Sequence, residues 1–456
     1  MQLTIYHSDK GDCSLVTAKD GARILADGGM AVSYNESVAP ELTKLLSDTK
    51  NKKLDVVYVS HIDDDHIGGI LKMLDDLMAW RVHDHHKKIG NTAVKAPTVP
   101  RPPDIDQIWH NGFSDMLADN AGPIASQLSQ SAAVLSGFTA SNHADSELGR
   151  AVAKHQDLAE SVPQAIKLSR RIADGQLGIA LNKSAGGLMM MRRANAKPIK
   201  VGSLRVHTLA PSEADLKELR DDWNKWLKAD KTVLAAINAK SKQDSAGLIS
   251  SGVALMEPML AESVRAAEAL SDALNKELNK TLGDRKPITS PNLASLMLLV
   301  KEGKKTILLT GDGHADDVTK GLDALKLLPK KGLHVDILKV PHHGATDNMT
   351  DDFATKVTAD HYVFCGNGFA SNPELAVIKR LADARLDTAK KATTAAALTG
   401  SFTFWFNCSS AVKNTTDQTA HMKKVEKFVA GLVKGSGGRM KANFMGPKEV
   451  AQVIQL

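Results

Sequence analysis

Two histidines and three aspartates fall within six consecutive positions of the segment SHIDDDHIGG, residues 60–69, which follows the apolar run LDVVYVS. Imidazole and carboxylate groups together suit Zn²⁺, Mn²⁺ or iron. Alternate residues leaving a strand can point toward one pocket, so we expect His61 and Asp63 to share one metal ion. Asp65 and His66 would begin the next helix and reach a second ion. An acidic helix cap explains one or two aspartates but not the histidines, so the segment predicts a metal site.

Two later segments also place metal-ligating residue types directly after an apolar run. ILLTGDG delivers Asp312 to a glycine-flanked turn, where a carboxylate could bridge two metal ions. DILKVPHHGAT ends in His342 and His343, and paired histidines at a strand end are uncommon as core residues. A strand–Gly–Asp turn is weak evidence alone, but α/β folds gather such strand ends at one edge of a sheet. We expect one of the two histidines, His342 in the first instance, to bind metal. His343 would then donate a proton to the leaving group.

Two further residues follow apolar runs and have competing interpretations. Asp27 in RILADGG would orient a ligand histidine, or it would simply form an Asp–Gly turn. His110 in IWHNGF would contact metal or substrate, or it would be an ordinary core histidine.

The composition limits the classes of function. Aromatic residues make up only 4% of the 456 residues, which argues against stacking of bases as the main activity, and the net charge of +6 permits a polyanionic partner without requiring one. The three cysteines are far apart, so neither a disulfide framework nor a cysteine-rich zinc site is expected, and a reducing cytoplasm fits best. No apolar run approaches the roughly 20 residues that a membrane helix needs, so we expect no membrane partner.

Strand-like and helix-like stretches alternate along the chain, which predicts an α/β fold whose core is interrupted twice. The expected parts are the first part of the core at 1–112, a helical insertion at 113–199, a core strand at 200–212, a second helical insertion at 213–286, the second part of the core at 287–412 and a helical C-terminal tail at 413–456. Insertions of that length usually cover a site or bind a partner.

The motifs and their order resemble one known family. SHIDDDHIGG resembles the HxHxDH signature of the metallo-β-lactamase fold hydrolases, with Asp63 where the second histidine usually stands. With LADGG upstream and LLTGD and DILKVPHHGA downstream, this HxDxDH variant is similar to the soluble hydrolase domain of the ComEC-type DNA-uptake channels. The match covers roughly residues 1–112, 200–212 and 287–407, and the two insertions have no counterpart in it.

The resemblance implies a four-layered αββα sandwich, a metal site at one edge of its two sheets, and hydrolysis that is often of phosphodiesters. Two divalent metal ions, Zn or Mn, are implied as cofactors. The implied ligands, carried over by position, are His61, Asp63, Asp65, His66, Asp312 and one of His342 and His343. The family has a late His–Pro where this chain has Asn372–Pro373, which leaves Asn372 as a candidate substrate contact and puts one ligand or proton donor in doubt.

Three hypotheses about function follow. The first is a phosphodiesterase or nuclease in which a metal-bound hydroxide attacks phosphorus, with Asp65 and His343 as the catalytic residues and a nucleic acid or another phosphodiester as substrate. The second is an esterase, lactonase or thioesterase that uses the same metal site. The third is a component of a multi-protein system, such as a bacterial defence system, whose helical insertions bind a protein partner.

Overall fold

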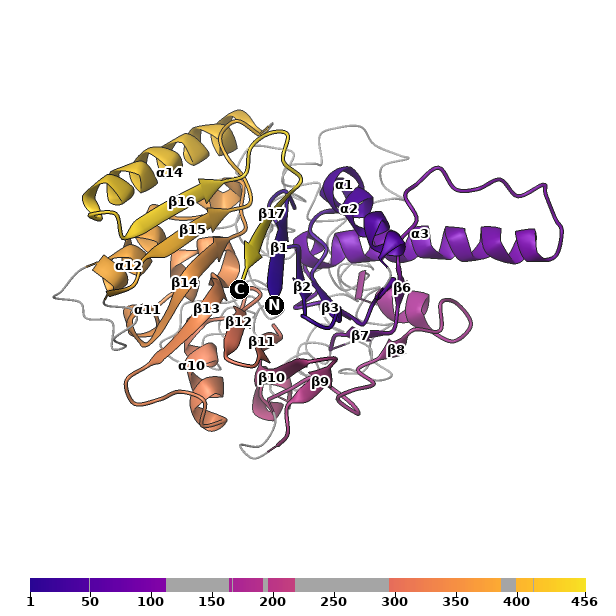
Figure 1. Cartoon of the computed structure of the whole chain (residues 1–456), viewed down its shortest axis with the longest axis horizontal. Coiled ribbons are helices and arrows are strands. Elements are labelled where there is room, and N and C mark those ends of the chain that lie inside the picture. The colour runs from indigo at the N-terminus through magenta and orange to yellow at the C-terminus, as the bar shows by residue number, and fades with distance from the viewer. Residues whose placement is uncertain are drawn as a thin grey trace, which may run out of the picture. The chain divides into compact units, whose positions relative to one another are not determined.

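The computed structural model divides the chain into two compact units, of which the larger holds Met1–Gly112, Gln164–Glu213 and Pro291–Leu456 (Figure 1). The described residues are 1–48, 50–111, 164–165, 167–191, 196–217, 295–386, 399–412 and 414–456. The smaller unit comprises 113–163 and 214–290 and lies almost entirely outside the described residues. The helices expected within those two ranges are therefore not described.

The first large sheet has seven strands in the order β17-β1-β2-β3-β5-β7-β8. Its strands are β1 Gln2–Tyr6, β2 Ser14–Thr17, β3 Arg23–Ala26, β5 Val56–Tyr58, β7 Gln107–Trp109, β8 Ala180–Leu181 and β17 Ala451–Gln455. The pairs from β17 to β3 are antiparallel, and those from β3 to β8 are parallel. The parallel strands β3, β5 and β7 thus end at the same edge.

The second large sheet has eight strands in the order β16-β15-β14-β13-β12-β11-β10-β9. Its strands are β9 Ile199–Val201, β10 Leu204–Ala210, β11 Met297–Glu302, β12 Lys305–Leu309, β13 Leu333–Lys339, β14 Val357–Phe364, β15 Phe402–Phe406 and β16 Met440–Phe444. Strands β9 to β12 form antiparallel pairs and β12 to β16 parallel ones. A separate two-stranded sheet pairs β4 Lys53–Leu54 with β6 Asp104–Ile105.

Helices connect many of these strands. The described α-helices are α1 Ala31–Ser33, α2 Ala39–Lys44, α3 Asp64–Lys88, α10 Ala315–Ala324, α11 Asp351–Lys356, α12 Leu375–Leu386 and α14 Thr416–Gly435. Local sequence explains their ends: α3 has two aspartates in its first turn and two lysines in its last, and α14 begins with a Thr415–Gln418 capping box. The expected α/β class is confirmed.

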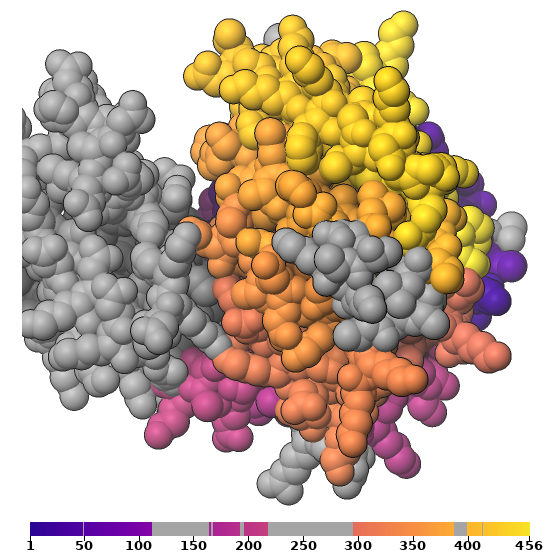
Figure 2. All heavy atoms as spheres, turned by 90° about the vertical axis from the view of Figure 1, so that its left-hand side faces the viewer, coloured from indigo at the N-terminus to yellow at the C-terminus, as the bar shows by residue number. Residues whose placement is uncertain are grey.

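The two large sheets share one hydrophobic core, to which the first contributes residues such as Ile5 and Ile24 and the second residues such as Val300 and Ile337. Side chains that alternate with these along the strands face the opposite sides. There the seven-stranded sheet packs against α2 and α3, and the eight-stranded sheet packs against α10, α11, α12 and α14. Figure 2 looks onto the second of these sides, where the C-terminal half of the chain, coral to yellow, forms the surface.

Two segments differ in structure from what their sequence led us to expect. Residues 164–199 were expected within the first helical insertion, but most of them pack on the core: Leu168 and Ile172 bury their side chains against the seven-stranded sheet, and β8 extends that sheet. A strand of two residues is too short to show an alternating pattern, so β8 could not be predicted from its sequence.

The C-terminal tail was expected to be helical, and it is helical only in α14. The following strands β16 and β17 add an edge to each large sheet, β16 beside β15 and β17 beside β1. Each is only partly buried and contains polar residues, among them the exposed Lys441 and Asn443 of β16 and Gln455 of β17, so their apolar signal is weak. None of the helices in the described part of the chain combines the length and apolar character of a membrane span.

Candidate metal centre

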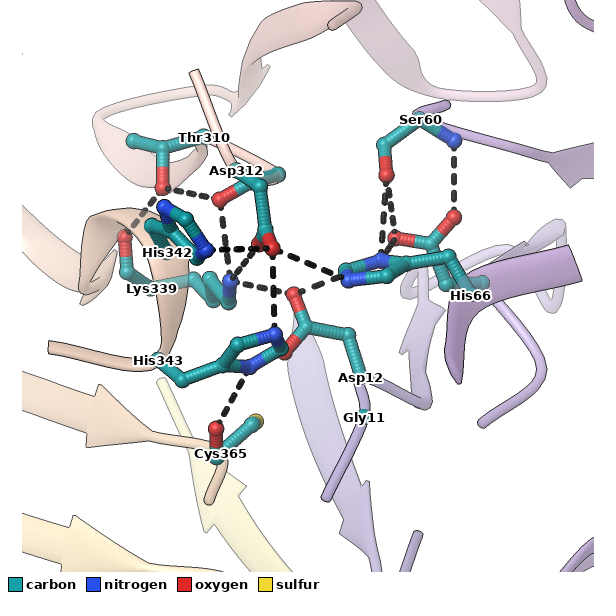
Figure 3. A network of polar contacts seen from close by, with 12 residues as sticks. Gly11, Asp12, Ser60, His66, Thr310, Asp312, Lys339, His342, His343 and Cys365 are labelled. Carbon is teal, nitrogen blue, oxygen red and sulfur yellow. Dashed lines mark hydrogen bonds and ion pairs between the residues drawn. The ribbon is translucent and has the colours of Figure 1, made fainter. Parts of the chain in front are cut away.

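The candidate site lies where strands of both large sheets end and their connecting turns meet (Figure 3). In the seven-stranded sheet, Asp27 directly follows β3 and His61 follows β5. In the eight-stranded sheet, Asp312 follows β12, and the turn Pro341–Gly344 follows β13. Asp12 comes from the turn between β1 and β2. Most of these residues are thus brought together by the rule that parallel strands end at a common edge.

One carboxylate oxygen, Asp312 Oδ2, lies among four imidazole nitrogens. Its distances to Nε2 are 3.0 Å for His343, 3.4 Å for His66, 3.6 Å for His342 and 3.8 Å for His61. His61 comes from the connection between β5 and α3, His66 from the first turn of α3, and the other two from the turn after β13. The structure therefore gathers residues from three of the predicted motifs around Asp312.

Hydrogen bonds at Nδ1 orient two of these rings. His66 Nδ1 lies 3.1 Å from Asp27 Oδ2, and His343 Nδ1 lies 2.7 Å from the carbonyl oxygen of Cys365. Because a carboxylate or a carbonyl oxygen only accepts, each Nδ1 carries the proton in the neutral ring and each Nε2 keeps a lone pair. Asp27 has the hydrogen bond that a residue orienting a ligand histidine needs, and its other oxygen accepts from the Ser60 N–H at 2.7 Å.

The rings of His61 and His342 are also oriented by hydrogen bonds at Nδ1. His61 Nδ1 contacts Ser60 Oγ at 3.0 Å; because that hydroxyl donates to Asp27 Oδ2 at 2.8 Å, it accepts from the ring. His342 Nδ1 contacts the side-chain oxygen of Asn348 at 2.7 Å. In its neutral form each of the four histidines would therefore present an Nε2 lone pair toward Asp312, which is the tautomer that binds a metal ion.

Several buried polar atoms of the cluster have no hydrogen-bond partner. They are Nε2 of His61, His66 and His343 and Oδ1 of Asp12 and Asp312. Buried atoms of this kind are normally satisfied, and a group of them converging on one point fits a bound cation. The four buried residues Asp12, His66, Asp312 and His343 offer ligand atoms that all lie within 4.8 Å of one another, so they could hold a metal ion. Two imidazoles and two carboxylates suit zinc, manganese or iron.

The electrostatics of the cluster are dominated by its own charges. Burial alone would raise the pKa of Asp312, but the imidazoles of His343 and His66 outweigh it and hold that pKa well below its usual range. Burial would likewise lower the pKa of His66 and of His343, but carboxylates, Asp312 foremost, raise both well above the usual value. The site is thus a set of carboxylates that require nearby positive charge.

Glycines let the backbone segments that carry the ligands approach each other closely. A Cβ on Gly69 would lie 2.0 Å from the Gly28 carbonyl oxygen, and a Cβ on Gly11 would lie 1.7 Å from that of Asp65. Gly28 N–H also donates to the His66 carbonyl oxygen at 2.8 Å. Because it lacks a side chain, Gly69 in the double glycine after His66 therefore allows the first turn of α3 to pack directly against the turn that contains Asp27.

The aspartates of SHIDDDHIGG divide between the site and the helix. Asp63 occupies the N-cap position of α3 but makes no capping hydrogen bond with its side chain, and its Oδ2 lies 3.5 Å from His61 Nε2. Asp65 Oδ2 lies 3.3 Å from His343 Nε2. Asp64 instead accepts a hydrogen bond from Gln164 at 2.8 Å. Two of the three aspartates thus face the candidate site, and the middle one does not.

The two adjacent histidines differ in burial. His343 is buried and belongs to the cluster of four, whereas the side chain of His342 is 30% exposed at its edge. Both residues have a positive φ, 45° for His342 and 52° for His343, in the left-handed region that non-glycine residues seldom adopt. This turn aims both rings at Asp312, and such conformations gather at functional sites.

Two other predicted residues are not members of the cluster of four. His110 is buried, its Nδ1 is 3.4 Å from the Val59 carbonyl oxygen, and its Nε2 has no hydrogen-bond partner. Burial lowers the pKa of His110 to about 4. Asn372 contributes backbone contacts: its carbonyl oxygen accepts from Gly368 N–H at 2.9 Å, and its N–H donates to Phe369. The structure thus gives a polar contact within the loop for Asn372, and the proposed substrate contact stays a prediction.

Two residues of the site were not predicted. Asp12, in the sequence GDC, lies 3.2 Å from His343 Nδ1 through Oδ1. Lys339, in LKVPHH, forms an ion pair with Asp12 Oδ2 and lies 3.5 Å from Asp312 Oδ1. Asp12 lies in a Gly–Asp turn between two short strands, which is a weak signal. A lysine close to two histidines is no signal of a metal site, because like charge disfavours a cation.

Comparison with models of known protein families finds no match for this chain, and no curated protein resembles it significantly. The assignment of function therefore depends on the geometry of the site and on the motifs of the sequence.

Proposed function

We propose that the protein is a metal-dependent hydrolase of phosphodiesters, built as a four-layered αββα sandwich of the metallo-β-lactamase kind. The observation that carries the proposal is the position of Asp312 Oδ2 among four histidine Nε2 atoms, three of which are buried without a hydrogen-bond partner. The shared core of the two sheets, with helices packed on the other face of each, supports the layered fold.

Two groups of ligands can be drawn from the distances, and Asp312 is shared by both. His61 lies near Asp63 and Asp312, whereas His343 lies near Asp65 and, together with His66, near Asp312. Divalent ions such as Zn²⁺ or Mn²⁺ would supply Lewis acidity and lower the pKa of a bound water toward neutrality. Several carboxylates among the ligands make Mn²⁺ acceptable beside Zn²⁺.

The side chains around the ions have separate tasks in this proposal. Asp27 and the carbonyl of Cys365 keep His66 and His343 in the tautomer that binds metal. His342 is the group best placed to donate a proton to a leaving oxygen, because its ring is held by Asn348 and remains partly exposed. This assigns to His342 the role that the sequence had suggested for His343.

A phosphodiester is favoured over a carbon ester by two features of the chain. The net charge of +6 favours an anionic substrate, and the order of the motifs resembles that of a hydrolase domain from DNA-uptake channels. Nucleic acid is the substrate class that we place first. A protein partner for the two insertions and a cytoplasmic location stay predictions from the sequence.

The proposal is tested with purified full-length protein loaded with Mn²⁺ or Zn²⁺, with bound metal measured by elemental analysis. The substrates are bis(p-nitrophenyl) phosphate, single- and double-stranded DNA, and RNA; a p-nitrophenyl ester, a lactone and a thioester test the alternative chemistry. We expect cleavage of at least one phosphodiester and a loss of at least about 100-fold in His61→Ala, the scale at which removing an essential catalytic group acts. Asp352→Asn, at an exposed position of α11, is the matched control and should retain full activity.

The proposal fails if the metal-loaded protein cleaves none of the phosphodiesters. Cleavage of an ester, lactone or thioester alone, lost in His61→Ala, would assign the site to carbon-ester chemistry.

A further inference from the structure

Lys339 places a charged ammonium group inside the candidate metal centre. It is the last residue of β13, and its side chain is only 6% exposed. Its Nζ forms an ion pair with Asp12 Oδ2, donates to the Gly311 carbonyl oxygen at 3.0 Å and lies 3.5 Å from Asp312 Oδ1 (Figure 3). Three oxygens thus surround an ammonium that has three N–H donors.

The lysine contacts one oxygen of each carboxylate and leaves the other for the cluster. Asp312 turns Oδ1 toward Lys339 and Oδ2 toward the four imidazoles. Asp12 turns Oδ2 toward Lys339 and, at 3.9 Å, toward His66 Nδ1, while its Oδ1 lies 3.2 Å from His343 Nδ1. The contacts of the ammonium therefore help to set how each carboxylate is oriented toward the histidines.

Burial makes this charge important. Asp12 and Asp312 are at most 5% exposed, and removing a carboxylate from water is costly unless positive charge lies nearby. A metal ion is one source of such charge, and Lys339 is a second that is always present. A role in contacting substrate is disfavoured, because the ammonium is buried and already surrounded by protein oxygens.

We propose that Lys339 is a resident cation of the metal centre, which holds Asp12 and Asp312 in place before metal binds. It is a positioning residue that acts through the two aspartates, and the inference rests on the proposed metal centre. Because like charges repel, its positive charge also weakens the binding of metal ions, so the lysine and the metal share the task of balancing the carboxylates.

The test compares wild-type protein with Lys339→Met, a substitution that removes the charge and keeps an unbranched side chain. We expect the chelated variant to unfold at a lower temperature than chelated wild-type protein. We also expect its affinity for Mn²⁺ or Zn²⁺, measured by titration calorimetry, to rise at least tenfold. Metal should therefore raise its unfolding temperature by more than it raises that of wild-type protein. Lys305→Met is the matched control, since Lys305 also pairs with an aspartate, Asp336, but outside the site.

A merely structural lysine would lower the unfolding temperature equally with and without metal. That result, or a metal affinity unchanged or reduced in Lys339→Met, would overturn the proposal.

A double variant, Lys339→Met with Asp12→Asn, keeps the test decisive if the single variant does not fold. It removes one positive and one negative charge together, so we expect it to recover most of the stability of the metal-free protein. Failure to recover it would refute the charge-balancing role. These readouts involve no hydrolysis, so an absence of phosphodiesterase activity would count against the proposed function alone.

Discussion

Asp27 offers a direct test of the candidate centre, because it touches a proposed ligand without being one. Its Oδ2 lies 3.1 Å from His66 Nδ1 and 2.8 Å from Ser60 Oγ, and both of those groups donate to it. In Asp27→Asn, an amide nitrogen at this position would donate, so the His66 ring would lose the acceptor that keeps its proton on Nδ1. The φ of Asp27 is 56°, and asparagine is among the few residues that tolerate this left-handed conformation, so the backbone should be preserved.

The expected magnitude follows from the loss of this hydrogen bond. Removing such a partner of a ligand histidine typically weakens metal binding by about 10–100-fold, and we take about 30-fold here. At a metal concentration of about 100 times the wild-type Kd, bound metal stabilises wild-type protein by about 2.7 kcal/mol and the variant by about 0.9 kcal/mol. For a larger unit of about 330 residues, the difference of about 1.8 kcal/mol corresponds to a metal-induced rise in Tm that is about 2–3 °C smaller.

Differential scanning calorimetry with added metal and with chelator measures this difference, and titration calorimetry measures the affinity. Asp352→Asn is the control, because that exposed aspartate lies on α11, and it should match wild-type protein in both. If Asp27→Asn shows the wild-type metal-induced rise in Tm, Asp27 does not orient a metal ligand and our interpretation of the site is wrong.

Three further predictions concern single positions. His343→Ala should abolish tight metal binding, whereas His342→Ala should retain bound metal and lose activity, because only His343 is buried in the cluster. Elemental analysis together with the activity assay distinguishes the two variants, and metal loss in both or in neither contradicts the assignment. Burial lowers the pKa of His110 to about 4, so above that value the unfolded chain binds the proton more readily than the folded protein does. The free energy of unfolding therefore decreases as the pH falls from 6.5 toward 4, and His110 accounts for about 2 kcal/mol of that decrease between pH 8 and 5. Urea unfolding of chelated His110→Gln should show a smaller decrease over this pH range than wild-type protein, and an equal decrease would refute the prediction. Phe404→Ala should lower the free energy of unfolding in urea by about 3–5 kcal/mol, because the Phe404 ring is fully buried and lies 5.2 Å from the Tyr362 ring and 5.3 Å from the Phe364 ring. A decrease below about 1 kcal/mol would mean that this core is not packed as described.

Much of the candidate site could be predicted because its residues follow strands that the sequence shows clearly. The buried run before His61 and those before Asp312 and His342 are short and apolar, and each is followed by polar groups in a turn. A chain that passes directly from a buried strand to such groups brings them to a sheet edge, whatever the rest of the fold. The prediction of a metal site in SHIDDDHIGG depended only on this local pattern.

Long-range packing determined the parts that sequence reasoning missed. Asp12 and Lys339 are 327 positions apart, and the residues around neither of them predict an ion pair. The choice between His342 and His343 depended on two left-handed residues in one turn, which no propensity predicts. The edge strands β16 and β17 were missed because their partners lie in different sheets and their own residues are partly polar.

The sequence by itself therefore determined the α/β class, the strands of the core and the residue types that meet at its edge, because these follow from burial and from the order of elements along the chain. Only the tertiary structure decided which histidine is buried, which aspartates face the histidines and where a compensating lysine sits. Those features depend on distances of a few ångströms between segments far apart in the sequence, and the periodicity of side chains along a helix or a strand carries no information about such distances.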